Sequence, residues 1–181
     1  MKKICVGLCG LTCSGKDTVA NIFAKHGFKK YSYTEKVLAP VAKSKNLPHT
    51  RDAYRVLLQK LGRKADELLF EEILKEKGTK IIIPNIRTSS ALDFWRNKKD
   101  FKFYLVKLDA DYKIRYKRYL SRKREIDPMV SKEDFNGVDE KDKKVNDLGK
   151  IINHEKFDFE ISNNGDLQEL GGKCIMIIKT L

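Results

Sequence analysis

The sequence predicts an α/β fold in which a five-stranded, mainly parallel sheet lies between two layers of helices. Short apolar runs bounded by turn residues alternate along the 181 residues with segments of helical periodicity. This alternation is typical of a three-layer α/β/α architecture. A glycine-rich loop separates the first apolar run from the first helical segment. Since no repeat and no proline- or glycine-rich linker divides the chain, we expect one domain over residues 1–181.

The strands and helices are expected in the following order. Buried strands are predicted at 3–8, 80–84, 102–108, 158–162 and 174–178, with a weaker one near 28–33. Helices are predicted at 16–26, 35–45, 51–62, 64–77, 89–98, 112–123 and 139–152, where apolar residues recur three and four apart. In such a sheet, ligands bind beyond the carboxyl ends of the strands.

The segment GLTCSGKD follows the first predicted strand and opens the first predicted helix. Gly10, Gly15 and Lys16 have the spacing of a phosphate-binding P-loop, in which backbone N–H groups and one lysine hold phosphate oxygens. The context of strand and helix places the chain in the P-loop NTPase fold class, with ATP as the expected nucleotide. The predicted nucleotide-binding residues are Gly10, Cys13, Ser14, Gly15, Lys16, Asp17 and Thr18.

Asp17 stands where such loops usually carry Ser or Thr, whose hydroxyl contacts Mg²⁺. A carboxylate is also an oxygen ligand that Mg²⁺ accepts. Asp17 is therefore the candidate metal ligand, and Thr18 still offers a hydroxyl to the nucleotide. In the alternative interpretation, Asp17 only stabilises the positive end of the helix.

GKDT, followed by Gly27 and Phe28, resembles the small P-loop kinases that phosphorylate nucleoside and deoxynucleoside monophosphates. The segment from Arg55 to Gly62, RVLLQKLG, is similar to the acceptor-site helix of deoxynucleoside monophosphate kinases. The resemblance implies that acceptor-binding helices occupy about 34–77. It also implies that Thr34, Glu35, Arg55 and Gln59 face the monophosphate, although a surface Arg and Gln on an amphipathic helix is the alternative.

The strand IIIPNIR ends in Asn85 and Arg87, where ligands gather. It resembles the D-V-R or D-G-x-R motif of deoxynucleotide kinases and of archaeal adenylate-kinase-related proteins. The resemblance implies that both residues contact the acceptor and that Arg87 takes part in catalysis. Asn85 replaces the expected acid, and we hypothesise that Asp17 supplies the missing charge.

A strongly basic helical segment begins after Asp111. Arginines that close over phosphates stabilise the charge that develops during phosphoryl transfer. Arg115, Arg118 and Arg122 share one helical face, and Arg118 and Arg122 are the favoured catalytic pair. The segment is similar to the lid of the archaeal adenylate-kinase-related proteins and, more loosely, of dephospho-coenzyme A kinases. This resemblance implies a small helical lid at about 118–140.

A turn follows the predicted strand at 158–162. Its Asn163 resembles the residue that lies near the adenine in these families, so Asn163 is included among the nucleotide-binding candidates. A purely structural role in the turn is the alternative.

The chain carries 38 Lys and Arg against 25 Asp and Glu, a formal charge of +13 that suits polyanionic ligands. Mixed runs such as 141–144 favour a solvated surface over a nucleic-acid-binding face. The four cysteines are expected to be reduced thiols, with Cys13 alone exposed. No membrane partner is expected, and the cytoplasm is the expected location.

These observations predict an ATP- and Mg²⁺-dependent phosphotransferase acting on a small-molecule acceptor, a nucleoside or deoxynucleoside monophosphate. Two alternatives stay open. One is a dephospho-coenzyme A kinase, and the other is a nucleic-acid-binding P-loop ATPase or nucleotide-sensing module.

Overall fold

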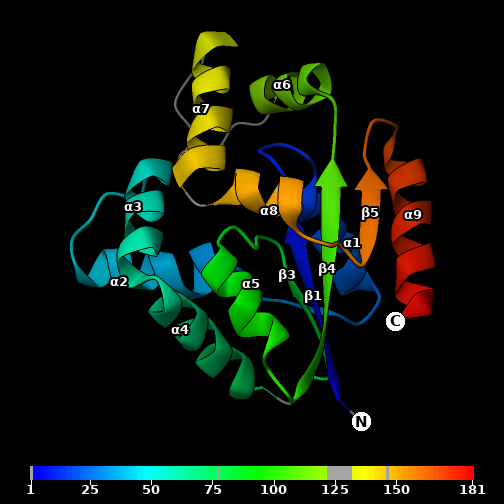
Figure 1. Ribbon diagram of the computed structural model, residues 1–181, viewed down its shortest axis with the longest axis horizontal. Helices are drawn as coiled ribbons and strands as arrows, with labels where there is room; N and C mark the ends of the chain where they lie inside the picture. The colour runs from blue at the N-terminus through cyan, green and yellow to red at the C-terminus, as the bar shows by residue number, and fades with distance from the viewer. Residues whose placement is uncertain (1, 77, 122–131, 146) are drawn as a thin grey trace.

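Five parallel strands in the order β2-β3-β1-β4-β5 form the central sheet of the computed structural model (Figure 1). The structure describes residues 2–76, 78–121, 132–145 and 147–181. The strands are β1 (Lys3–Cys9), β2 (Lys29–Lys30), β3 (Lys80–Ile83), β4 (Phe101–Asp109) and β5 (Phe159–Ser162). Because β1 lies in the middle, its carboxyl end opens between those of β3 and β4, where a ligand would bind.

Helices cover both faces of this sheet. They are α1 (Lys16–Lys25), the π-helical turn η1 (Thr34–Leu38), α2 (Ala39–Ser44), α3 (Arg51–Leu61), α4 (Arg63–Leu74), α5 (Ser89–Arg96), α6 (Tyr112–Ser121), α7 (Lys132–Val145), α8 (Leu148–His154) and α9 (Leu167–Thr180). The three-layer α/β/α fold and the parallel sheet of five strands are confirmed.

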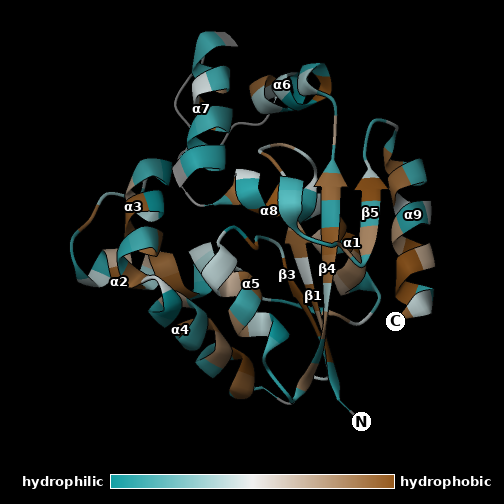
Figure 2. Ribbon diagram, viewed as in Figure 1, coloured by the Kyte–Doolittle hydropathy of each residue, from teal (hydrophilic) through white to brown (hydrophobic). Residues whose placement is uncertain are grey.

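The alternation of side chains along β1 divides the core into two layers. Cys5 and Cys9 belong to the apolar cluster shared with η1, α4 and α5, whereas Val6 and Leu8 belong to the cluster shared with α1 and α9. Both faces of the strand are therefore buried, which explains its nearly continuous apolar sequence. Figure 2 shows the same pattern as hydrophobic strands beneath helices with hydrophilic outer surfaces.

One predicted strand and the extent of one predicted helix are wrong. Residues 174–178 were expected to form a strand but lie within α9. A short apolar run cannot be assigned by periodicity alone, and here Leu170, Cys174 and Ile177 are buried at helical spacing while Met176 is exposed. The fifth strand is instead β2, inside the weakly predicted segment 28–33.

The helix predicted at 139–152 is two helices, α7 and α8. Asp147 lies just before α8 with a left-handed backbone at φ 54. This conformation is unfavourable inside a right-handed helix. The break turns α8 so that Leu148 and Ile151 enter the core beneath it.

A buried polar network joins the residue before η1 to α4 and α5. Tyr33, just before η1, donates its hydroxyl to Asp66 Oδ1 on α4 at 2.5 Å. Trp95 Nε1 on α5 donates to the same hydroxyl at 2.9 Å. Burial raises the pKa of Asp66 to about 6, although the hydrogen bond from Tyr33 opposes the shift. This network places a titrating group inside the core.

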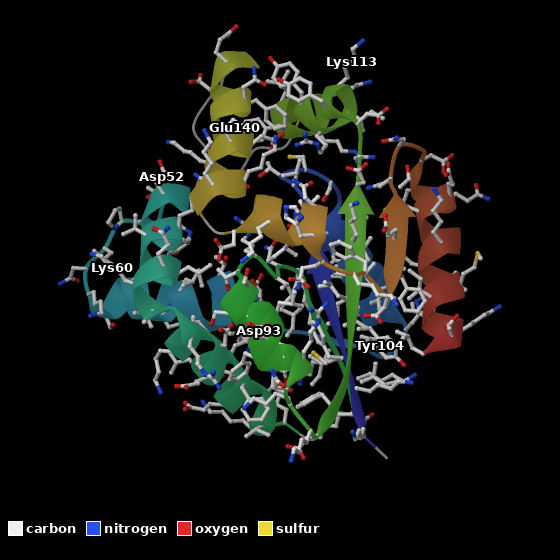
Figure 3. The ribbon with its side chains drawn as sticks, viewed as in Figure 1. Asp52, Lys60, Asp93, Tyr104, Lys113 and Glu140 are labelled. Carbon is white, nitrogen blue, oxygen red and sulfur yellow. The ribbon has the colours of Figure 1, made fainter. Side chains whose placement is uncertain are left out.

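Most of the positive charge lies at the surface, where Lys60 and Lys113 are exposed (Figure 3). Acidic side chains such as Glu140 are exposed among them. The four cysteines form no disulfide, and Cys13 alone is partly exposed, as expected. Of the helices that the structure describes, none combines the length and apolar character needed to cross a membrane.

Candidate nucleotide and acceptor site

The loop between β1 and α1 can be built only with glycine at two positions. Gly10 and Gly15 have φ values of 155° and 105°. A Cβ on Gly10 would lie 2.3 Å from the carbonyl oxygen of Leu108, and one on Gly15 would lie 2.2 Å from Asn163 Nδ2. The loop is therefore closely packed against Leu108 and Asn163. It leads directly into the positive end of α1, an arrangement that favours the binding of phosphate.

Lys16 folds back over this loop. Its Nζ donates to the carbonyl oxygens of Gly10 at 2.7 Å and Leu11 at 2.8 Å. Burial, and next to it the positive charge of Arg87, lower the pKa of Lys16 to about 8. An anion bound in the loop would offset both effects, because it supplies the negative charge that a buried ammonium group lacks.

Asn163 fixes the loop from the opposite side. Its Nδ2 donates to the carbonyl oxygen of Ser14 at 2.7 Å, and its Oδ1 accepts a bond from Arg118 Nη2 at 3.3 Å. Asn163 is buried and does not line the pocket described below. Its contact with a nucleotide base stays a prediction, while its contact with the loop is a structural role that the sequence left open.

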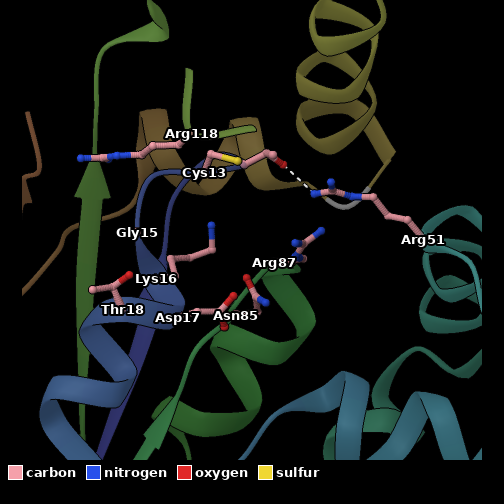
Figure 4. Close-up of a pocket in the computed structure, with 10 residues that line it drawn as sticks. Cys13, Gly15, Lys16, Asp17, Thr18, Arg51, Asn85, Arg87 and Arg118 are labelled. Carbon is pink, nitrogen blue, oxygen red and sulfur yellow. Dashed lines mark hydrogen bonds between the residues drawn. The ribbon is translucent and has the colours of Figure 1, made fainter. Parts of the chain in front are cut away.

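A pocket of about 350 Å³ opens above the carboxyl ends of β1 and β3 (Figure 4). It brings together predicted site residues from the loop, from the end of β3 and from α6. It is lined by Thr12, Cys13, Gly15, Lys16, Asp17, Thr18, Arg51, Asn85, Arg87 and Arg118. Four of the lining side chains are cationic, namely Lys16, Arg51, Arg87 and Arg118. Among all the lining residues, Thr12 and Arg51 were not predicted as site residues.

Two oxygen-bearing side chains lie next to one another on one side of this pocket, Asp17 and Asn85 (Figure 4). Asp17 is the only carboxylate among the lining residues that the structure describes. Asn85 Oδ1 is buried, and no hydrogen-bond partner for it is found in the described part of the chain. Since Mg²⁺ prefers oxygen ligands and retains several waters, this pair fits a magnesium ion.

Arg118 reaches the pocket from α6. Its Nη2 donates to the carbonyl oxygen of Asn163 at 3.0 Å. Its Nη1 is buried, and within the described residues it has no hydrogen-bond partner. A buried guanidinium N–H without an acceptor lowers the stability of the fold. This nitrogen is therefore suited to donate a hydrogen bond to an anionic oxygen. Arg122 and the part of the predicted lid at 122–131 fall outside the described residues.

Arg115, on the same helix, turns away from the pocket. Its guanidinium pairs with both carboxylate oxygens of Asp139 on α7, at 2.8 and 2.6 Å. It also donates to the carbonyl oxygen of Thr12 at 3.2 Å. Arg115 thereby ties α6, α7 and the loop together.

The main residue that sequence reasoning missed is Asp142. It lies in the mixed run 141–144, which was interpreted as solvated surface, yet its side chain is only 1% exposed. Its carboxylate accepts a bond from Thr12 Oγ1 at 2.6 Å and from Arg55 Nη2 at 2.7 Å. Arg51 and Arg87 lie 3.4 Å from it. No local spacing signals these partners, because they come from three distant segments.

Four predicted acceptor residues lie outside this pocket. Arg55 is buried against Asp142 and also pairs with Asp52 at 2.6 Å. Thr34 on η1 is partly exposed, and Glu35 and Gln59 are exposed. Their contact with an acceptor stays a prediction, whereas Arg51, one turn before Arg55 on α3, is the residue of this helix that reaches the cavity.

The sequence profile of the AAA domain family AAA_18 matches residues 6–136, from β1 into α7. The chain belongs to this family. The match includes the loop, Arg51, Arg87 and Arg118 but ends before Asp142. The AAA_18 chain is also 32% identical over 126 residues to the UPF0200 protein PAE1629 of Pyrobaculum aerophilum, covering 68% of this chain and 69% of that protein.

Solved structures place this AAA_18 chain in the fold of P-loop kinases. TT1252 from Thermus thermophilus superposes with a TM-score of 0.68 at 15% identity, over 99% of this chain and 98% of that one. Shikimate kinase from Acinetobacter baumannii gives 0.59 at 16% identity, over 98% and 94%. The APS kinase CysC of Mycobacterium tuberculosis gives 0.54 at 13% identity, over 98% of both chains. The family and the P-loop kinase fold are thus established, whereas the predicted activity on mononucleotides is not.

Proposed function

We propose that this protein is an ATP- and Mg²⁺-dependent phosphotransferase that phosphorylates a nucleoside or deoxynucleoside monophosphate. One observation carries the proposal. The glycine-rich loop with Lys16 lines the same 350 Å³ pocket as Arg51, Arg87 and Arg118. A pocket with a phosphate-binding loop and further guanidinium groups suits two phosphorylated ligands that meet in line.

On the donor side, the loop amides and Lys16 bind the β- and γ-phosphates. Lys16 leaves the carbonyl oxygens of Gly10 and Leu11 for a phosphate oxygen. Asp17 and Asn85 would hold Mg²⁺ directly or through its waters, and the ion would neutralise part of the phosphate charge. Arg118 would turn its unpartnered Nη1 towards the group being transferred and stabilise the charge that spreads over the oxygens of that group.

The charge of the pocket favours a phosphate acceptor over a hydroxyl acceptor. A hydroxyl must lose a proton, which kinases achieve with a carboxylate base near the attacking oxygen. Asp17 is the only carboxylate among the described lining residues, and it lies beside the loop. A phosphate acceptor is already ionised and needs arginines to overcome its repulsion from ATP. Arg51 and Arg87 supply them.

The domain organisation follows from the same proposal. One kinase domain spans 1–181, the segment 34–77 carries the acceptor-binding helices, and a lid occupies about 118–140. Thr34, Glu35, Arg55 and Gln59 would contact the acceptor only in a more closed arrangement of these helices. The proposed location of the enzyme is the cytoplasm, where mononucleotides and ATP occur together.

A panel of acceptors tests the proposed activity. Purified protein is incubated with Mg²⁺, ATP and, in separate reactions, ribo- and deoxyribonucleoside monophosphates, dephospho-coenzyme A, shikimate and gluconate. We expect a nucleoside diphosphate to form with at least one monophosphate, and Lys16→Met to abolish it. Turnover of dephospho-coenzyme A or of a hydroxy acid, but of no mononucleotide, would replace the proposed acceptor class.

The formal charge of +13 supports a second candidate, a nucleic-acid-binding P-loop ATPase. Neutralisation of several backbone phosphates would make binding to RNA or DNA steeply salt-dependent. Fluorescence anisotropy with labelled single- and double-stranded oligonucleotides between 50 and 200 mM salt, roughly the range over which such binding collapses, separates the two. Tight, salt-dependent binding together with oligonucleotide-stimulated ATP hydrolysis would favour this candidate.

A further inference from the structure

Asp142 on α7 is a buried carboxylate with three arginine side chains around it. Its Oδ1 accepts bonds from Arg55 Nε at 3.1 Å and Nη2 at 2.7 Å, and its Oδ2 accepts one from Thr12 Oγ1 at 2.6 Å. Arg51 and Arg87 lie at the same carboxylate. Three guanidinium groups therefore surround this one carboxylate.

The three arginines are not held equally. Arg55 binds Asp142 through two nitrogens and has a second acid, Asp52. Arg51 and Arg87 each approach Asp142 only to 3.4 Å. These two are also the ones that line the pocket. Since charge-assisted hydrogen bonds to carboxylates are normally 2.7–2.9 Å long, the contacts of Arg51 and Arg87 with Asp142 are weak. Arg51 also donates to Thr12 Oγ1 at 2.7 Å. Both arginines face a cavity where an anion would bind them.

The electrostatic state of the cluster agrees with this geometry. Burial alone would raise the pKa of Asp142, but Arg87, Arg51 and Arg55 together hold it well below its usual range. Asp142 is thus ionised over the physiological pH range. Burial also lowers the pKa of Arg87, which means that this guanidinium is short of negative charge. A phosphate group, with more charge and more oxygens than a carboxylate, meets that need.

We propose that Asp142 is an internal counter-anion of the acceptor subsite: it holds Arg51 and Arg87 while the subsite is empty and yields them to the acceptor's phosphate. The inference rests on the proposed function, because it assumes that the acceptor is a phosphate monoester. Asp142 is a positioning residue, since it acts through the arginines and not on the reacting atoms. It also competes with the acceptor for them.

This arrangement couples the acceptor subsite to α7. Asp142 is attached to the loop through Thr12 and to α3 through Arg55. An acceptor phosphate that takes Arg51 and Arg87 removes two of the cations that keep the carboxylate buried. The contact of α7 with the loop is weakened as a result. Acceptor binding would therefore change the contacts of α7 with the loop and with α3.

The matched variants are Asp142→Asn and Asp139→Asn. Both replace a buried carboxylate of α7 by an amide of the same shape, and both acids pair with arginine. Only Asp142 contacts the pocket arginines. Inorganic phosphate is titrated calorimetrically into each protein without nucleotide. We expect Asp142→Asn to bind phosphate about tenfold more tightly than the unaltered protein, because an internal competitor has been removed. Asp139→Asn should stay within about twofold.

A further variant assigns the gain to the arginines. In Asp142→Asn combined with Arg51→Gln, we expect most of the increased phosphate affinity to be lost, which excludes the loop as its source. Unchanged or weaker phosphate binding by a folded Asp142→Asn protein would overturn the proposal. An equal gain in Asp139→Asn would also overturn it, because the effect would then come from loosening α7.

Hydrogen exchange tests the same idea in the unaltered protein. Phosphate or a mononucleotide should increase amide exchange in residues 138–144, whereas protection of this segment would contradict the proposal. The outcome is separable from that of the proposed function. If no mononucleotide is phosphorylated but the phosphate titrations behave as expected, the anion subsite stands and the acceptor class fails. If mononucleotides are phosphorylated but Asp142→Asn gains no affinity, only the counter-anion role fails.

Discussion

The side-chain amide of Asn163, at the end of β5, donates a hydrogen bond to the carbonyl oxygen of Ser14 in the glycine-rich loop, 149 residues earlier in the chain. It lies so close to Gly15 that no side chain fits between them. The conformation of the phosphate-binding loop therefore depends on a residue contributed by the last strand of the sheet. This dependence can be measured.

Replacement of Asn163 by alanine should loosen the loop. The change leaves the buried carbonyl of Ser14 without its donor, which costs about 1–3 kcal/mol of folding free energy. We expect ATP to bind about tenfold more weakly, as measured by calorimetry, since the loop must now be ordered at the expense of binding energy.

Asn164→Ala is the control for this change. Asn164 follows in the same turn but is exposed and bonds Asp111 on the surface. Its replacement should leave ATP affinity nearly unchanged. Equal losses in both variants would show that the turn matters as a whole and that the contact with Ser14 has no special role.

Asp17→Asn should raise the Mg²⁺ concentration required for half-maximal turnover by about tenfold, because an amide is a weaker ligand for a hard cation than a carboxylate. The measurement is a Mg²⁺ titration of initial rates at saturating nucleotide. Lys30→Gln is the control, since Lys30 Nζ lies 3.9 Å from Asp17 Oδ1 without lining the pocket. An unchanged metal requirement in Asp17→Asn would leave Asp17 with only a stabilising role at the start of α1.

Arg118→Lys should lower kcat by about 100-fold or more while KM for ATP changes little, because lysine cannot reproduce the planar contacts that stabilise the transferring group. Steady-state kinetics give both constants. Lys117→Gln, which alters the exposed neighbouring residue on α6, should be nearly silent. A lysine variant with normal kcat would remove Arg118 from the catalytic residues.

Asp66 should make the free energy of unfolding fall as pH rises. Its folded pKa of about 6 lies above the ordinary value of 3.8, so the folded protein binds more protons than the unfolded chain between these values. The stability that protonation provides is present below pH 4 and is lost as pH rises through 6. The full effect is about 3 kcal/mol.

Urea unfolding at several pH values between 4 and 8 measures this slope. Asp66→Asn keeps an oxygen that accepts the hydroxyl of Tyr33 but cannot ionise. The variant should therefore show a flatter dependence and greater stability than the unaltered protein at pH 8. If the two proteins had the same slope, the titrating group would lie elsewhere.

The parts of this molecule that local sequence determines were predictable. The loop was recognised because Gly10, Gly15 and Lys16 lie within seven residues, and the sheet was recognised because its buried strands are apolar on both faces. The strand wrongly expected at 174–178 shows the limit of this approach. A five-residue apolar run fits a buried strand and a half-buried helix equally well, and only the packing of α9 against α1 decides between them.

The cluster around Asp142 was not predictable from any spacing. The other members lie 55 to 130 residues from Asp142 along the chain, and Asp142 is flanked by exposed lysines on both sides. Amphipathic runs with mixed charge usually indicate surface, and three of the four residues at 141–144 follow that rule. Arg51 was missed for a similar reason, since its role is visible only once α3 is placed beside the loop.

The edge strand β2 has a consequence for how the protein behaves at high concentration. Exposed strand edges invite neighbouring molecules to extend the sheet through their own backbone. Here the edge next to β3 is only two residues long, and both of them are lysines. Incoming chains would find almost no unpaired amides to join and would meet two positive charges, so this border of the sheet resists intermolecular β-pairing.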